Sequence, residues 1–348
     1  MSGFEFGPIG VPFRPRALLI SIGALILLLV LVVAGIAAGS ATIGPADVVR
    51  TLLGGGTHAQ HLIVVELRLP RVLTGVLVGL CLGIAGALTQ TFTRNPLATP
   101  DIIGVTAGAS AGAVGAIVLG GGTYAVTGLL LGSGIPAAAI AGALIASAVT
   151  YGLGWRNGVE SYRLILVGIG VGSVLTAFTS YLLVRAQIIE ATQATAWLVG
   201  SLNGTTWDGV RPLLIVTAVA GPLAVACSAP LAIAQLGDET ATGVGLGVQR
   251  HRLLVIALTV VLTGSSVAAA GPIGFVAFVV PQIAVRIAAA SRPPIVLSGL
   301  LGGCLVVGAD LAARTVFPWV VPVGLLTTVV GAPYLIWLLI RHRREFIS

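Results

Sequence analysis

The chain has 348 residues, of which 57% are hydrophobic and 8% charged, and its formal net charge is +7. Soluble domains average about a quarter charged residues, so this composition excludes an ordinary soluble protein and indicates a membrane protein. All 18 cationic residues are arginines, and without a lysine the chain can form neither a P-loop for ATP nor a lysine Schiff base. No basic run is long enough to indicate a nucleic-acid partner.

Long apolar runs follow one another along the chain, and several exceed the roughly 20 residues that a helix needs to cross a bilayer core. The first run is longer than the apolar part of a secretory signal, so we interpret it as an uncleaved span. The sequence predicts an all-α polytopic membrane protein with a single transmembrane domain over residues 1–348. About ten transmembrane helices are expected, at 17–38, 72–92, 102–120, 134–154, 163–184, 212–233, 253–270, 273–290, 295–312 and 322–340.

The arginines indicate how these spans are oriented. With both termini in the cytoplasm, twelve of the 18 arginines fall on the cytoplasmic side, and cytoplasmic loops usually carry such an excess of positive charge. The polar stretch AQLGDETATGVGLGVQRHR at 234–252 is then cytoplasmic. Glycines at a spacing of four predict close helix packing within two spans, at Gly75, Gly79 and Gly83 and at Gly104, Gly108 and Gly112.

Acidic residues fall at predicted span ends, in loops or at termini, so no mid-span carboxylate marks an ion-coupling site. The sequence also contains no constellation of nucleophile, base or metal ligands that indicates an enzyme. The three scattered cysteines are interpreted as small buried hydrophobic residues. A protein with many spans and no energy source of its own indicates a subunit that a partner powers.

Four sequence blocks carry a family resemblance when they are taken together and in order. They are RLPRVLTGVLVGLCLGIAGALTQTFTRNPLATPDIIGVTAGASAGA at 68–113, LGDETATGVGLGV at 236–248, AGPIGFVAFVVPQIAVR at 270–286 and GADLAARTVFPWVVPVGLLTTVVGAPYLIWLL at 308–339. The chain resembles the iron-chelate and vitamin B12 permease family of bacterial ABC importers over nearly its whole length.

This resemblance implies a type II ABC importer permease, with ten helices per subunit and two permease subunits around a central path. An ABC ATPase dimer would bind on the cytoplasmic side and a substrate-binding lipoprotein outside, with lipid of the cytoplasmic membrane around the helices. The chain itself is then a transport subunit and not an enzyme. It would bind no cofactor or metal, because the partner ATPase uses the ATP and magnesium. The expected cargo is a ferric siderophore, with cobalamin or haem as the alternative and an ion-coupled secondary transporter as the alternative class.

The 234–252 stretch is the candidate coupling loop, because in the family this segment forms short helices that sit in a cleft of the ATPase. Its candidate residues are Gly237, Asp238, Glu239, Thr240, Gly243 and Gly245. We expect Asp238 to cap the N-terminus of a helix and Glu239 to lie in its first turn, and the following glycines to end it. The alternative is an ordinary polar, glycine-rich loop.

Three arginines, Arg68, Arg71 and Arg314, are expected on the outside. The resemblance matches them to arginines that meet acidic residues on the binding protein, and the alternative is that they anchor span borders. Such surface pairs steer docking more than they add affinity.

Two proline corners are expected near the translocation path, because proline fixes φ and cannot continue a helix. Their residues are Asn95, Pro96, Pro100 and Gly104 in one corner, and Gly271, Pro272 and Gly274 in the other, at the opposite face. Gln282 stands where the family usually has histidine, and Val285 where arginine is usual, with Arg286 one position further. The proline–glutamine form favours a heterodimer of permease subunits over a homodimer.

Overall fold

The computed structural model describes residues 15–345 apart from positions 40, 42, 121–133, 157, 159 and 320. Its helices are α1 (Pro15–Ala37), α2 (Pro45–Leu52), α3 (His58–His61), η1 (Leu62–Arg68), α4 (Leu69–Thr93), η2 (Pro100–Ile103), α5 (Val105–Leu119), α6 (Gly134–Gly154), α7 (Ser161–Arg185), α8 (Ile188–Leu198), α9 (Trp207–Ala226), α10 (Ser228–Ala234), α11 (Asp238–Gly243), α12 (Val248–Ala270), α13 (Val276–Ala288), α14 (Ile295–Thr315) and α15 (Val323–Glu345).

Each of the ten predicted spans overlaps a helix of the structure, and two of them, 102–120 and 212–233, overlap two helices each. In the described part of the chain, seven helical stretches are long and apolar enough to cross a membrane: α1, the continuous run His58–Thr93, α6, α7, α9, α12 and α14. Three further apolar stretches are shorter, namely α5, α13 and the part Val323–Trp337 of α15. The predicted span 212–233 was wrong at its end, because α9 stops at Ala226 and α10 starts at Ser228.

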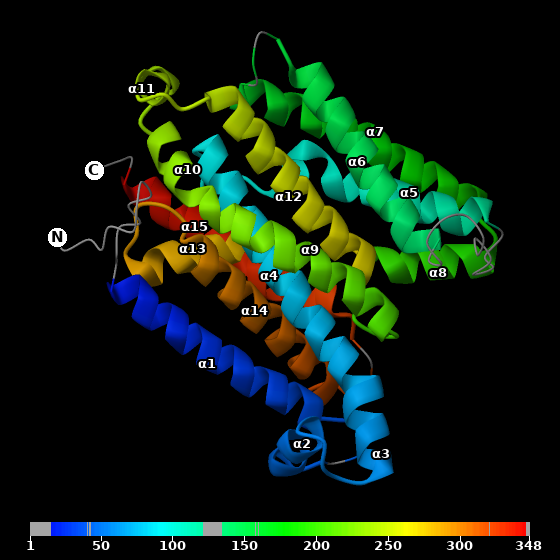
Figure 1. Ribbon diagram of the computed structural model, residues 1–348. Coiled ribbons are helices and arrows are strands. Elements are labelled where there is room, and N and C mark those ends of the chain that lie inside the picture. The colour runs from blue at the N-terminus through cyan, green and yellow to red at the C-terminus, as the bar shows by residue number, and fades with distance from the viewer. Residues whose placement is uncertain are drawn as a thin grey trace.

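Helix α4 is the centre of the bundle, and nearly every residue from Leu77 to Thr93 is buried. It packs against α14, α12, α13 and α9, while α1 packs on the outside of α14 (Figure 1). A second group is formed by α5, α6 and α7, which α12 connects to α4. Figure 1 shows α2 and α3 at one end of the bundle, and α11 with the start of α1 at the other.

Close helix packing at the four-residue glycine repeats is confirmed for four of the six positions. A Cβ added at Gly79 or Gly83 would lie well under 3.0 Å from backbone atoms of α14, and one at Gly108 or Gly112 would meet the backbone of α6 in the same way. Since lipid provides no hydrophobic drive between helices, this close backbone contact is what holds them together. Gly75 instead faces side chains. Gly104 likewise faces side chains, of α6 and α7, and its φ of +77 at the end of η2 is a second reason for glycine there.

Candidate functional site

The 234–252 stretch folds as a turn and the short helix α11 between α10 and the start of α12 (Figure 1). The cap predicted for Asp238 was wrong. Gly237, with φ +115, is the N-cap, and Asp238 is the first helical residue with no capping bond. A glycine adopts this positive φ without strain, which leaves the Asp238 carboxylate available for other contacts. Glu239 lies in the first turn, as expected.

The end of α11 also follows the prediction that glycines stop the helix. Gly245 has φ +85, and its N–H donates to the carbonyl of Thr242 while the N–H of Leu246 donates to that of Ala241. This pattern closes a helix on a left-handed glycine. Glu239, Thr240, Gly243 and Val244 are exposed on the short helix and the turn that follows it, so the segment presents a small mixed polar and apolar surface.

The Asp238 carboxylate joins three separate segments. Arg94, at the end of α4, donates to it over 3.0 Å, and Arg252, in the first turn of α12, over 3.1 Å. Arg94 also donates to the carbonyl of Ala234 at the end of α10 over 2.5 Å. The Asp238 side chain is 50% exposed, and exposed pairs contribute only about 0.2–1 kcal/mol each. The cluster therefore sets the position of α11 more than it stabilises the fold.

Sequence reasoning missed Arg94, although it directly precedes the Asn95–Pro96 corner. The residue takes a left-handed conformation with φ +53 as the C-cap of α4, which turns its side chain towards α11. A cavity of about 330 Å³ adjoins this cluster, and its lining includes Glu160 and Ser161 at the start of α7. The end of α4, the start of α7 and the candidate coupling loop therefore meet in one place.

The arginines expected to dock a binding protein make contacts within the chain. Arg68 donates to the carbonyls of Ile36, Ala37 and Ala41 over 2.6–2.9 Å at the end of α1. Arg71 lies 2.7 Å from Asp310, and Arg314 lies 3.0 Å from the same carboxylate. The last carbonyls of a helix are natural partners for arginine, so these contacts support the anchoring alternative. Docking stays a prediction.

Asp310 is the residue of this group that sequence reasoning did not single out. Its side chain is only 3% exposed, while Arg71 and Arg314 keep 21% and 16% of theirs exposed. Arg314 also donates to the carbonyls of Gly35 and Ala38. The cluster therefore ties α1, α4 and α14 together at one end. Reversing the charge of all three arginines would break these ties, so a loss of binding-protein capture in that variant would not by itself demonstrate docking.

The two proline corners lie on one cavity. In the first, Asn95 Oδ1 accepts the N–H of Leu97, and Pro100 begins η2. Both Pro100 and Pro272 line a cavity of about 70 Å³, together with Gly274 of the second corner. At Pro100 and Pro272 the two corners therefore lie close together and not at opposite faces, whereas Asn95 and Pro96 do not line this cavity. Helices α5 and α13 are short, and each begins several residues after its proline corner. The segments that precede them therefore extend into the bundle.

Gly271 allows the second corner to form. Its φ of +69 and ψ of −179 fall in a region that is essentially restricted to glycine. A Cβ at this position would also lie well under 3.0 Å from the carbonyl oxygen of Trp197. We expect Gly271→Ala to lower the free energy of unfolding by about 2 kcal/mol, measured by denaturant titration in detergent. The control is Gly209→Ala, because a Cβ on Gly209 meets nothing within 4 Å. Equal effects of the two variants would contradict the prediction.

Gln282, the departure from the family pattern, has a partner inside its own subunit. Its Nε2 donates to Oε1 of Gln90 over 2.6 Å, and Nε2 of Gln90 donates to the carbonyl of Phe278 over 3.0 Å. Both amides are buried, so this chain of bonds satisfies them between α4 and α13. Arg286 lies over the rings of Tyr334 and Trp337, with its Cζ 5.6 and 4.7 Å from their centroids. None of these contacts tests the heterodimer prediction.

Helix α7 carries an exposed face on which small polar side chains alternate with the large apolar Leu166, Ile169 and Val184, and sequence reasoning did not identify this face. Ser173, Thr176 and Ser180 are exposed on it, and their hydroxyls donate to carbonyls one turn back. A Cβ added at Gly170 or Gly172 would meet nothing within 4 Å. Hydroxyls that donate to a carbonyl of their own helix are tolerated in a bilayer, yet a helix that faces lipid gains little stability from them. The face therefore suits contact with water or with another subunit.

The described part of the chain is thus a bundle of many helices, several of membrane-spanning length, with a polar loop of short helices at one end, which is the architecture of a polytopic membrane protein. The chain belongs to the FecCD transport family, whose family model matches residues 27–341. It is thus a transport subunit, a multi-span permease of the ABC importer type.

Several relatives match most of the chain. The ferric enterobactin transport system permease protein of Escherichia coli (strain K12) is 39% identical over 337 residues, covering 95% of this chain and 98% of the relative. A siderophore transport system permease protein of Bacillus subtilis (strain 168) is 37% identical and covers 88% of this chain and 90% of its own length. The cobalamin import system permease protein of Halobacterium salinarum is 38% identical over 82% of this chain and 75% of the relative.

The fold is also found in a solved structure. An inward-facing conformation of a metal-chelate type ABC transporter matches with a TM-score of 0.82 and 24% sequence identity. The match covers 92% of this chain and 99% of the other chain. At this identity the likeness concerns the fold alone.

Proposed function

We propose that this chain carries a ferric siderophore across the cytoplasmic membrane, as the permease subunit of an importer that a separate ABC ATPase powers. The cargo is inferred from the relatives, because two of the three compared above are named for ferric enterobactin or siderophore transport. Cobalamin is the second candidate, since a cobalamin import permease is 38% identical, and haem is an alternative on the family resemblance alone.

The observation that carries the proposed coupling is the cluster around Asp238. Through Arg94 and Arg252 this one carboxylate joins α11 to the end of α4 and the start of α12. Both of these helices are largely buried, and they pack against each other. A force applied to α11 by an ATPase would therefore be transmitted directly to the centre of the bundle.

The path itself is proposed to lie along the exposed, mixed polar and apolar face of α7, opposite a second permease subunit. An exposed face with three hydroxyls and two glycines favours a wet path or a subunit contact over lipid. In this arrangement ten helices cross the membrane and both termini are cytoplasmic. The ATPase dimer would bind at the end of α11, and the substrate-binding protein at the end where α2 and α3 lie.

The coupling role is tested by Asp238→Asn and by the double variant Asp238→Ala, Glu239→Ala. We expect uptake to fall about tenfold while ATP hydrolysis continues, because the loss of the charge releases Arg94 and Arg252 from α11. The measurement is cargo uptake and ATP hydrolysis in the same proteoliposomes, made with the partner ATPase. Asp47→Asn, on α2 at the other end of the bundle, is the control, and it should leave the ratio of uptake to ATP hydrolysis unchanged. Tightly coupled, normal uptake by Asp238→Asn would argue against this role.

The transporter class is tested by the energy source. Uptake should require the co-expressed ATPase and be inhibited by vanadate. Uptake that survives without the ATPase and collapses with the proton gradient would instead identify an ion-coupled secondary transporter.

A further inference from the structure

A cavity of about 360 Å³ lies where several helices begin or end, away from the α7 face and the Asp238 cluster. It is bounded by the first turns of α1, the end of α4, the junction of α9 with α10, and the segment from Ala290 into α14. Its volume falls in the range of about 300–1,000 Å³ that is typical of small-molecule sites. Nothing in the transport mechanism proposed above uses it.

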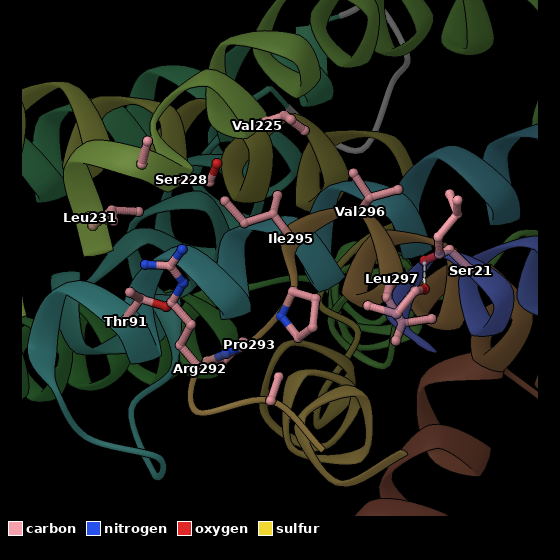
Figure 2. A pocket seen from close by; sticks show the side chains of 15 residues that line it. Ser21, Thr91, Val225, Ser228, Leu231, Arg292, Pro293, Ile295, Val296 and Leu297 are labelled. Carbon is pink, nitrogen blue, oxygen red and sulfur yellow. Dashed lines mark hydrogen bonds between the residues drawn. The ribbon is translucent and has the colours of Figure 1, made fainter. Parts of the chain in front are cut away.

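The lining is mostly apolar, and its charged side chain stands at one end of the cavity. Figure 2 shows Arg292 with Thr91 and Leu231 at one end, and Leu297 with Ser21 at the other. Arg292 belongs to the segment between α13 and α14, and Thr91 lies two residues before α4 ends. Ser21, by contrast, is six residues into α1, which is about 9 Å along the helix at 1.5 Å per residue. The charged end therefore lies at the end of the bundle, and the uncharged end lies deeper.

The outer rim of this cavity can be reached from the membrane. Leu18 and Val296 line it and remain 48% and 49% exposed, and α1 lies at the edge of the bundle (Figure 1). Among the fifteen lining residues, Arg292 is charged and none is acidic. A membrane-bounded cavity of this kind matches a molecule with a negative head and an apolar tail, held head outward.

We propose that this cavity binds an anionic phospholipid. The Arg292 guanidinium would face the phosphate, with the hydroxyls of Thr91 and Ser228 near the head. The first part of an acyl chain would lie against Leu18, Val225 and Val296. An anionic head is favoured over a neutral one because a cation near the membrane surface attracts anionic lipids, whereas the apolar lining does not distinguish between them. The bound lipid would then bridge α1 to α10 and α14.

The test uses the full-length permease, exchanged from detergent into nanodiscs of phosphatidylcholine with or without phosphatidylglycerol. Lipid retained after extraction is counted by native mass spectrometry. The wild type should retain phosphatidylglycerol in preference to phosphatidylcholine, and Arg292→Gln should retain about fivefold less of it. Ala229→Phe, which fills the cavity and keeps the charge, should also lose the lipid. Arg156→Gln removes an exposed arginine outside the cavity and should behave as the wild type.

The thermal unfolding midpoint in lipid-free detergent shows whether each variant folds. If Ala229→Phe does not fold, Val296→Trp at the rim of the cavity is used in its place. Equal retention by Arg292→Gln and the wild type would overturn the proposal, and so would equal retention of the two lipids by the wild type. If the cavity variants keep their lipid but lose association with the ATPase, the cavity is a protein contact and the proposal is wrong.

Discussion

Replacing Asp310 with asparagine is expected to lower the free energy of unfolding by about 3 kcal/mol, the range for removing one partner of a buried ion pair. The carboxylate is 3% exposed and forms ion pairs with both Arg71 and Arg314. Asparagine keeps the volume but leaves two neighbouring guanidinium groups without a counter-ion. The ends of α1, α4 and α14 should then separate more easily, which denaturant titration of the purified subunit in detergent would measure.

The matched control is Asp208→Asn. Asp208 also pairs with an arginine, Arg211, but the distance is 3.9 Å and the two side chains are 92% and 73% exposed. Exposed pairs of this kind contribute about 0–1 kcal/mol, so this variant should be close to the wild type. If the two variants are equally stable, the buried cluster does not hold the three helices together.

Gly79→Val is expected to lower the free energy of unfolding by at least as much, about 3 kcal/mol or more, because the contact that it disturbs is between two backbones. An added Cβ at Gly79 would meet the carbonyl of Gly302, and one at Gly302 would meet the carbonyl of Gly79. Neither neighbour is a flexible side chain that could rotate away. Helices α4 and α14 would have to move apart along the most extensive contact of α4. The effect is measured as loss of folded protein in detergent, which size-exclusion chromatography and thermal unfolding both monitor.

Gly170→Ala on α7 is the control for helix propensity. A Cβ at Gly170 meets nothing within 4 Å, so alanine should be neutral or should stabilise the helix by up to about 1 kcal/mol. A destabilisation of Gly170→Ala as large as that of Gly79→Val would show that the glycines act through the helix itself and not through its packing. Because α7 is proposed to line the path, stability and not uptake is the readout here.

The family and the positions of the helices were accessible from the sequence because each depends on local information. A membrane helix must form all its backbone hydrogen bonds within itself, and its apolar run must be long enough to cross the bilayer core. An apolar run such as 134–154 therefore predicts α6 residue for residue. The contact between Gly79 and Gly302 was accessible on one side, because the four-residue glycine repeat marks Gly79 as a packing position. The repeat does not identify its partner helix. The order of the four sequence blocks can likewise be recognised in the sequence alone, before the fold is known.

The contacts that organise the candidate site were not accessible in this way. Asp238 was expected to cap α11, yet it binds Arg94, which is 144 positions away in the chain. Asp310 pairs with Arg71 across 239 positions, and this pairing takes up an arginine that the family resemblance assigned to an external partner. Local spacing carries no information about such distances, and a charged residue near a span border looks the same whether it faces water or a buried partner.

By itself, the sequence determined that this protein is a helical membrane permease of the FecCD transport family. Composition, apolar run length and the order of the motifs are sufficient for that conclusion. Only the tertiary structure decided where the corners at Pro100 and Pro272 meet, which arginines are held within the chain, and where a cavity of about 360 Å³ opens between α1, α10 and α14. The physical reason is that these features depend on how the helices pack, and packing brings together residues that no local pattern connects.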